Sequence, residues 1–140
     1  MNFIDYNREY GPLPQFSNLS LLKLTIGLLN IDILPTLLES CPNLKSLVLS
    51  LDFDPSKEKP GMRLSSVPRC LVSSLESVEI KRFNGGTAKM EVARYFVENS
   101  VILKKLVLRV GFSSIQQGYF MLRDLLALPR RSNTCQILAC

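Results

Sequence analysis

The sequence predicts an α/β fold built as a short solenoid, with parallel strands on one face and helices and loops on the other. The first observation is a motif of the form Leu-x-x-Leu-x-Leu-x-Leu over Leu44–Leu51, with related copies that begin at Leu19, Leu75 and Leu103. The second is the spacing of these copies by 25, 31 and 28 residues, close to the period of about 20–29 residues in leucine-rich repeats. The third is a stretch of helical periodicity between most of the copies, as a strand-and-return repeat requires.

Each copy predicts a strand, because its apolar residues alternate with a period of two and so lie on one side of an extended chain. The predicted strands lie within residues 16–26, 44–51, 75–83 and 104–110, and a closing strand is expected over residues 134–140. Their inward-facing pairs are Leu22 and Leu24, Leu47 and Leu49, Val78 and Ile80, and Leu106 and Leu108. These pairs predict one apolar ladder beneath the sheet.

Three helices are predicted between the strands. The first covers residues 31–40, with Asp32 as its N-terminal cap and Pro35 in its first turn, where a proline is tolerated. The second covers residues 88–100, and the charged residues that we expect to face water are Lys89, Glu91, Arg94 and Glu98. The third ends at residue 128, and its expected buried stripe consists of Tyr119, Leu122, Leu125 and Leu126.

The chain divides into three predicted parts. Residues 1–15 are expected to be an irregular N-terminal edge, because a glycine between prolines and polar residues disfavours both helix and strand. Residues 16–66 hold leucine-rich-repeat-like units followed by a loop from residue 52 to residue 66, which we expect to be solvated because it is charged and contains two prolines and a glycine. Residues 67–140 form the third part.

The composition argues against catalysis, cofactors and metals. The chain of 140 residues contains no histidine, which removes the commonest catalytic arrangements of serine and cysteine. It also contains no glycine-rich phosphate-binding motif. Its four cysteines include no Cys-x-x-Cys pair, so we expect reduced thiols rather than zinc ligands. We therefore predict that the protein is not an enzyme and has no catalytic, cofactor-binding or metal-binding residues.

The charge pattern favours neither nucleic acid nor a membrane as a partner. The net charge is +5, from 17 basic and 12 acidic residues, and the basic residues occur singly or in short pairs without interleaved aromatic residues. No apolar run predicts a membrane span, because Asp32 and Pro35 interrupt the most apolar one. The N-terminus shows no secretory signal, so we expect an intracellular protein that is cytoplasmic, nuclear or both.

A candidate partner-binding surface follows from the strand periodicity. If the inward-facing pairs point to the core, the residues between them lie on the opposite side of the sheet. One predicted row across the strands is Lys23, Val48, Glu79 and Val107, and the next is Thr25, Ser50, Lys81 and Arg109. Such a face is a common binding surface in solenoids, and its mixture of valines, hydroxyls and opposite charges favours a protein partner. The alternative is a solvated face whose charges only maintain solubility.

The second half of the chain resembles a known family. The resemblance is carried by Val67–Ile80, Gly85-Gly86, Ala93–Asn99, Leu103–Leu106 and Leu125–Ile137, in this order. Together these segments resemble the FBD domain, which is found at the C-terminus of many plant F-box proteins with leucine-rich repeats. Residues 67–140 are therefore expected to form an FBD domain, and residues 13–51 resemble the repeats that normally precede it.

The resemblance implies a non-catalytic protein-interaction module, similar to the substrate-recognition part of an F-box subunit of an SCF-type ubiquitin ligase. We find no F-box in the sequence, so we expect a protein substrate or partner of unknown identity and no direct binding of the Skp-type adaptor. Two alternatives remain open: a truncated product without an independent function, and a nucleic-acid-binding module, for which the charge pattern gives little support.

Overall fold

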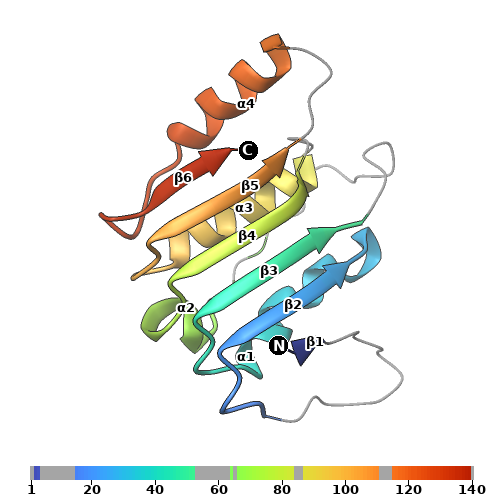
Figure 1. Ribbon diagram of the computed structural model, residues 1–140, viewed down its shortest axis with the longest axis vertical. Helices are drawn as coiled ribbons and strands as arrows, with labels where there is room; N and C mark the ends of the chain where they lie inside the picture. Colours follow the sequence, from blue (N-terminus) through green and yellow to red (C-terminus); the bar gives the residue numbers. More distant parts are fainter. Residues whose placement is uncertain are drawn as a thin grey trace.

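The computed structural model describes residues 2–3, 15–52, 64, 66–83, 87–110 and 115–139. Its central feature is a six-stranded parallel sheet whose strands follow one another in chain order (Figure 1). The strands are β1 (Asn2–Phe3), β2 (Leu21–Ile26), β3 (Ser46–Leu51), β4 (Ser77–Phe83), β5 (Lys105–Val110) and β6 (Gln136–Ala139). The predicted α/β solenoid is confirmed, with its four repeat strands and its closing strand. The two-residue β1 lies within the part that was expected to be irregular.

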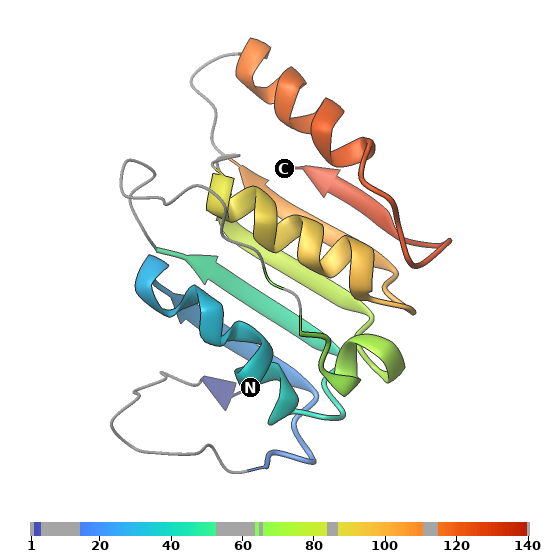
Figure 2. The ribbon, with the colours of Figure 1, turned by 180° about the vertical axis from the view of Figure 1, so that it is seen from behind.

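The described helices lie on one side of the sheet or beyond its last strand. They are a 3₁₀ helix, η2 (Leu28–Ile33), followed by α1 (Leu34–Glu39), α2 (Arg69–Ser73), α3 (Thr87–Asn99) and α4 (Ile115–Leu126). Seen from behind, α1 and α3 lie across the back of the sheet, and α4 lies at the β6 end (Figure 2). None of the described helices therefore lies in front of the sheet (Figure 1).

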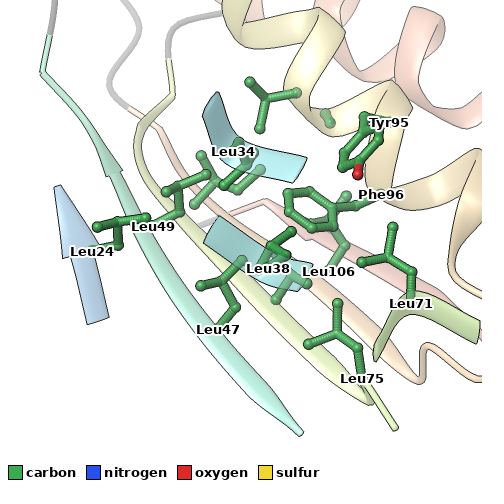
Figure 3. Packing of buried hydrophobic residues seen from close by; sticks show 14 of the residues in the cluster. Leu24, Leu34, Leu38, Leu47, Leu49, Leu71, Leu75, Tyr95, Phe96 and Leu106 are labelled. Atoms are coloured by element: carbon green, nitrogen blue, oxygen red, sulfur yellow. The ribbon is translucent and has the colours of Figure 1, made fainter. Parts of the chain in front are cut away.

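Aliphatic side chains in register form the core between the sheet and the helices. Each of two rows runs across four strands, and their members are Leu22, Leu47, Val78 and Leu106, and Leu24, Leu49, Ile80 and Leu108. All eight side chains are at most 2% exposed, and burial of each leucine contributes roughly 1.5–3 kcal/mol relative to exposure. Figure 3 shows the sheet leucines in the same cluster as Leu34 and Leu38 of α1 and Tyr95 and Phe96 of α3. The predicted inward-facing pairs are confirmed.

A ladder of backbone hydrogen bonds stacks the turns that precede the strands. The N–H of Lys45 donates to the carbonyl oxygen of Ser20 at 2.9 Å, and the N–H of Glu76 donates to that of Lys45 at 2.8 Å. The series continues from Lys104 to Glu76 at 2.7 Å and from Gln136 to Lys104 at 2.9 Å. Each turn therefore fixes where the next strand begins relative to its neighbour, and the side-chain rows stay aligned across the sheet.

The first helix differs from the prediction at its start. The 3₁₀ helix η2 comes first and α1 begins at Leu34, and no side chain caps either helix, so Asp32 is not a cap. A 3₁₀ helix has three residues per turn, which places Ile31 and Leu34 on one side, and both are at most 1% exposed. Burial of this pair, rather than a polar cap, accounts for the local conformation. Pro35 lies in the first turn of α1, as predicted.

The second helix, α3, is buried on the side that was predicted to face water. Lys89 and Glu91 are only 3% and 8% exposed. The backbone of Leu64 lies over this side of the helix: its N–H donates to Glu91 Oε2 at 2.6 Å, and its carbonyl oxygen accepts from Arg94 Nη2 at 3.0 Å. The prediction was wrong because the helical pattern alone contains no information about a distant segment that covers the helix.

Polar contacts attach the covering segment to α3. Tyr95 Oη donates to the carbonyl oxygen of Ser66 at 2.7 Å. Arg94 forms an ion pair with Glu91 and a second one with Glu98 at 3.0 Å, and its side chain is 14% exposed. The hydrogen bond with Glu91 raises the pKa of the Arg94 guanidinium. The end of the loop that was predicted to be solvated is therefore packed, while residues 53–63 and Gly85-Gly86 lie outside the described residues.

The buried stripe of α4 is also shifted from the predicted one. Leu125 is fully buried and Met121 is 5% exposed, whereas Tyr119 and Leu126 are 63% and 58% exposed. The helix contacts α3 and β6. Met121 and Leu125 join the core, and the predicted Leu122 is half-buried against it. The prediction placed Tyr119 and Leu126 in the core because they lie on the flank of this stripe, where helical periodicity does not separate a buried position from an exposed one.

Replacement of Leu49 or Leu106 by aspartate is expected to unfold the protein. Both side chains are 0% exposed, so either substitution places an unpaired charge in the apolar core. Thermal unfolding followed by circular dichroism should lose its cooperative transition. Leu138→Asp is the matched control, because Leu138 is 43% exposed, and it should keep the transition. A soluble Leu49→Asp variant that melts like the wild type would contradict the strand register.

Arg94→Ala is expected to lower the free energy of unfolding by about 3 kcal/mol, because it leaves the Glu91 carboxylate buried without its cation. Denaturant titration measures this change. Arg69→Ala removes an ion pair with Glu39 whose side chains are 70% and 49% exposed, so it should cost less than about 1 kcal/mol. Adding Glu91→Gln to Arg94→Ala should restore part of the loss. Equal effects of Arg94→Ala and Arg69→Ala would show that the Arg94 cluster is not a buried ion pair.

Candidate functional site

The helix-free side of the sheet, which we call the open face, is the candidate site. Its residues alternate with the buried ones along β2 to β6, and they are Leu21, Lys23, Thr25, Ser46, Val48, Ser50, Ser77, Glu79, Lys81, Lys105, Val107, Arg109, Gln136 and Leu138. The structure places all the predicted partner-binding residues on this face. No described helix lies in front of it (Figure 1).

The strand register brings the first predicted row together. Lys23 is aligned with Val48, Val48 with Glu79, and Glu79 with Val107, and the row continues to Leu138 on β6. Neighbouring strands lie about 4.8 Å apart, so these side chains form a continuous strip across the sheet. The first four are half-buried and Leu138 is exposed. The strip offers aliphatic surface between charged groups.

The second predicted row is in register only in part. Thr25 is aligned with Ser50 and Ser50 with Lys81, but the alignment of β4 with β5 shifts before it reaches Arg109. The row therefore continues across three strands and then meets an irregularity. Arg109 still lies on the open face, and it is exposed.

A β-bulge in β4 causes this shift. Ile80 and Phe83 are both fully buried although they are three positions apart, so Lys81 and Arg82 both lie exposed between them. Arg82 has a φ of 58°, in the left-handed region, which costs a residue other than glycine roughly 1–2 kcal/mol. The buried ammonium of Lys89 donates to the carbonyl oxygen of Arg82 at 2.6 Å and so stabilises the bulge. The three-residue step from Ile80 to Phe83 was the sequence signal for it.

Ion pairs between neighbouring repeats organise the charges along the strands. Glu79 Oε2 lies 3.3 Å from Arg109 Nε on the open face. Three further pairs follow the same rule, and they are Glu39–Arg69 at 3.3 Å, Asp52–Arg82 at 3.0 Å and Glu76–Lys104 at 3.5 Å. In all four the acid precedes the base by 28 or 30 residues, or about one repeat. This spacing is readable in the sequence, but strand periodicity alone does not reveal it.

Six residues of the open face extend the site beyond its predicted rows. Five are the first residues of β2 to β6, namely Leu21, Ser46, Ser77, Lys105 and Gln136, and the sixth is Leu138 on β6. All six continue the period-two alternation that defined the predicted rows. Carrying that alternation to both ends of every strand would have included them.

The FBD protein-family model matches residues 63–108. This range includes Leu64, whose backbone contacts Glu91 and Arg94 of α3, and it continues through β4 and α3 to β5. Residues 63–108 are therefore similar to the FBD domain. The resemblance seen in the sequence is thereby confirmed, while the expected extension of the domain to residue 140 stays a prediction.

The similarity to known proteins extends over the whole chain. It is 60% identical over 140 residues to the FBD-associated F-box protein At5g22730 of Arabidopsis thaliana, covering 100% of this chain and 30% of the relative. It is 44% identical to the F-box/FBD/LRR-repeat protein At1g78750 of the same plant, covering 95% and 29%. It is 41% identical to the F-box/FBD/LRR-repeat protein At5g22660, covering 98% and 30%. The chain thus spans about three tenths of the length of these relatives. No solved structure matches the chain.

A hollow of about 260 Å³ lies between α1 and the segment that precedes α2. It is lined by Pro35, Thr36, Glu39, Ser66, Val67 and Pro68. Glu39 accepts hydrogen bonds from the backbone N–H and Nε of Arg69, both at 3.3 Å, so its carboxylate is already engaged. Within the described ranges, no three His, Cys, Asp or Glu side chains are arranged to hold a metal ion. None of the helices described is long and apolar enough to cross a membrane.

Three cysteines are free thiols buried in the core, and they are Cys41, Cys70 and Cys135. Cys70 Sγ lies 3.7 Å from the carbonyl oxygen of Leu38. Burial raises the pKa of Cys70 to about 12 and also raises those of Cys41 and Cys135. A thiol that stays protonated is a poor nucleophile, so these residues do not form a reactive centre.

The buried thiols are expected to resist modification in the native protein. At pH 8.5, Cys70 should react with a disulfide reagent roughly a hundredfold more slowly than in denaturant, because it is protonated and inaccessible. A Cys140→Ser background removes the fourth thiol, and mass spectrometry identifies the labelled site. Since the native pKa lies above the unfolded one, Cys70 stabilises the fold below pH 9, and this contribution is lost as the pH rises from about 9 to 12. Rapid labelling of native Cys70 would contradict this environment.

Proposed function

We infer that the chain is a non-catalytic protein-interaction module that corresponds to the substrate-recognition part of an F-box subunit of an SCF-type ubiquitin ligase. The observation that carries this proposal is the open face. Its row from Lys23 through Val48 and Glu79 to Val107 is aligned across four strands, and no described helix covers it. Aliphatic groups flanked by charges and hydroxyls are typical of a protein-binding surface.

The relatives support the assignment of this role to the matched region. The names of all three relatives describe F-box proteins with an FBD domain, and two of the names also include leucine-rich repeats. An F-box recruits the Skp-type adaptor in this family, so we assign partner recognition, and not adaptor binding, to the segment in hand. In this proposal residues 16–66 supply repeat strands, residues 67–140 supply the FBD part, and the protein acts inside the cell.

Affinity recovery from an Arabidopsis thaliana extract tests the proposal. The tagged 140-residue chain is compared with a Val48→Gln/Val107→Gln variant, which removes aliphatic surface from the open face. Val67→Gln/Val72→Gln is the matched control. Val67 precedes α2 and is 44% exposed, and Val72 lies in α2 and is 51% exposed, so both are away from the open face. We expect a discrete set of proteins whose recovery falls at least about fivefold with the open-face variant, and less than about twofold with the control.

Recovery at two salt concentrations separates the remaining functions. Protein partners that persist at moderate salt support the recognition module. Nucleic acid that is released steeply as salt rises would favour the nucleic-acid-binding alternative. Aggregated bait accompanied by chaperones would favour a product without an independent function. Equal recovery by the wild type and the open-face variant would remove the binding role from this face.

A further inference from the structure

The open face carries more positive charge than its own residues neutralise. It holds four basic side chains and one acidic one. The acid, Glu79, is paired with Arg109 at 3.3 Å. Lys23, Lys81 and Lys105 have no carboxylate within ion-pairing distance among the described residues. No described carboxylate therefore compensates these three ammonium groups.

Among the described residues, the acids next to these strands do not offset this excess, because each already has a base. Asp52, just beyond β3, pairs with Arg82 at 3.0 Å. Glu76, just before β4, pairs with Lys104 at 3.5 Å. These ion pairs join residues about one repeat apart on neighbouring strands or turns. The three open-face lysines take part in none of them. The surplus charge is thus a property of this face and not only of the whole chain.

The three lysines surround aliphatic surface. Lys23 lies on β2 beside Val48, Lys81 lies on β4 two positions beyond Glu79, and Lys105 lies on β5 two positions before Val107. From strand spacing and rise per residue, the backbone of Lys81 is roughly 12 Å from that of Lys23 and roughly 14 Å from that of Lys105. An extended segment of about four or five residues spans either distance. The geometry suits carboxylates about four residues apart with aliphatic residues between them.

We propose that the open face binds an acidic segment of a protein partner, in which aspartate or glutamate residues alternate with aliphatic ones. This inference rests on the proposed function and adds the chemistry of the partner. The carboxylates pair with Lys23, Lys81 and Lys105, and the aliphatic groups contact Val48 and Val107. A nucleic acid fits less well, because a phosphate chain gains little from the valines and the open face carries no aromatic residue for base stacking.

Selection from a random 12-residue peptide library on phage tests the proposal with the full 140-residue chain as the target. Peptides recovered on the wild type are expected to be enriched in Asp and Glu together with Val, Leu and Ile. Their affinity should fall about tenfold or more for a Lys23→Gln/Lys81→Gln/Lys105→Gln variant, which removes three charge contacts. Circular dichroism verifies that the variant is folded, as expected for surface substitutions.

A matched control separates local recognition from general charge attraction. Arg69→Gln/Arg123→Gln/Arg131→Gln lowers the net charge by the same amount at positions outside the open face, and it should bind the selected peptides within about twofold of the wild type. Replacing the acidic residues of a selected peptide by their amides should also weaken it about tenfold or more. Equal loss in both triple variants, no acidic enrichment, or no selected peptides would overturn the proposal.

Two further outcomes distinguish this inference from the proposed function. A 12-nucleotide single-stranded DNA that binds the open face as tightly as the best peptide would overturn the acidic-protein assignment in favour of a polyanion. Selected peptides without acidic enrichment, combined with partners that Val48→Gln/Val107→Gln still loses, would overturn only the partner chemistry. Failure of both experiments would remove binding from the open face altogether.

Discussion

Burial of two aliphatic rows between the parallel sheet and its helices is the constraint on which the rest of this structure depends. Leu47 and Leu49 show why the register cannot shift: a slip of β3 by one residue would turn both to solvent and bury Ser46, Val48 and Ser50 instead. The composition of the open face is therefore tied to the composition of the core. Residues at alternate positions are free to vary in charge because their neighbours in the chain supply the packing.

Each repeat is joined to the next through three kinds of contact at the same spacing. The aliphatic rows pack, the turn backbones form a hydrogen-bond ladder from Ser20 to Gln136, and ion pairs such as Glu79–Arg109 connect neighbouring strands. The exposed ion pairs add little stability individually, but they set which charges are satisfied within the chain. The basic side chains that these pairs leave without an acidic partner determine the charge that the open face presents.

The FBD segment contains the features that depart most from a regular repeat. Within residues 63–108, the Leu64 backbone covers α3, the Glu91–Arg94 pair is buried beneath it, and β4 contains the bulge at Arg82. These features place polar groups in the interior and strain in the backbone, and each is satisfied by a specific partner. None of them forms a reactive centre, and the buried thiol of Cys70 is held protonated.

The sequence by itself determined the repeat, the strands and the rows of the open face, because period-two burial and a period near 30 residues are local or periodic signals. Even the positions of Lys23, Val48, Glu79 and Val107 followed from them. Only the tertiary structure decided that Lys89 and Glu91 are buried and that Tyr119 is exposed. Each of these depends on a contact between distant segments or on the end of a row, where a helical or strand pattern is the same whether the position is covered or not.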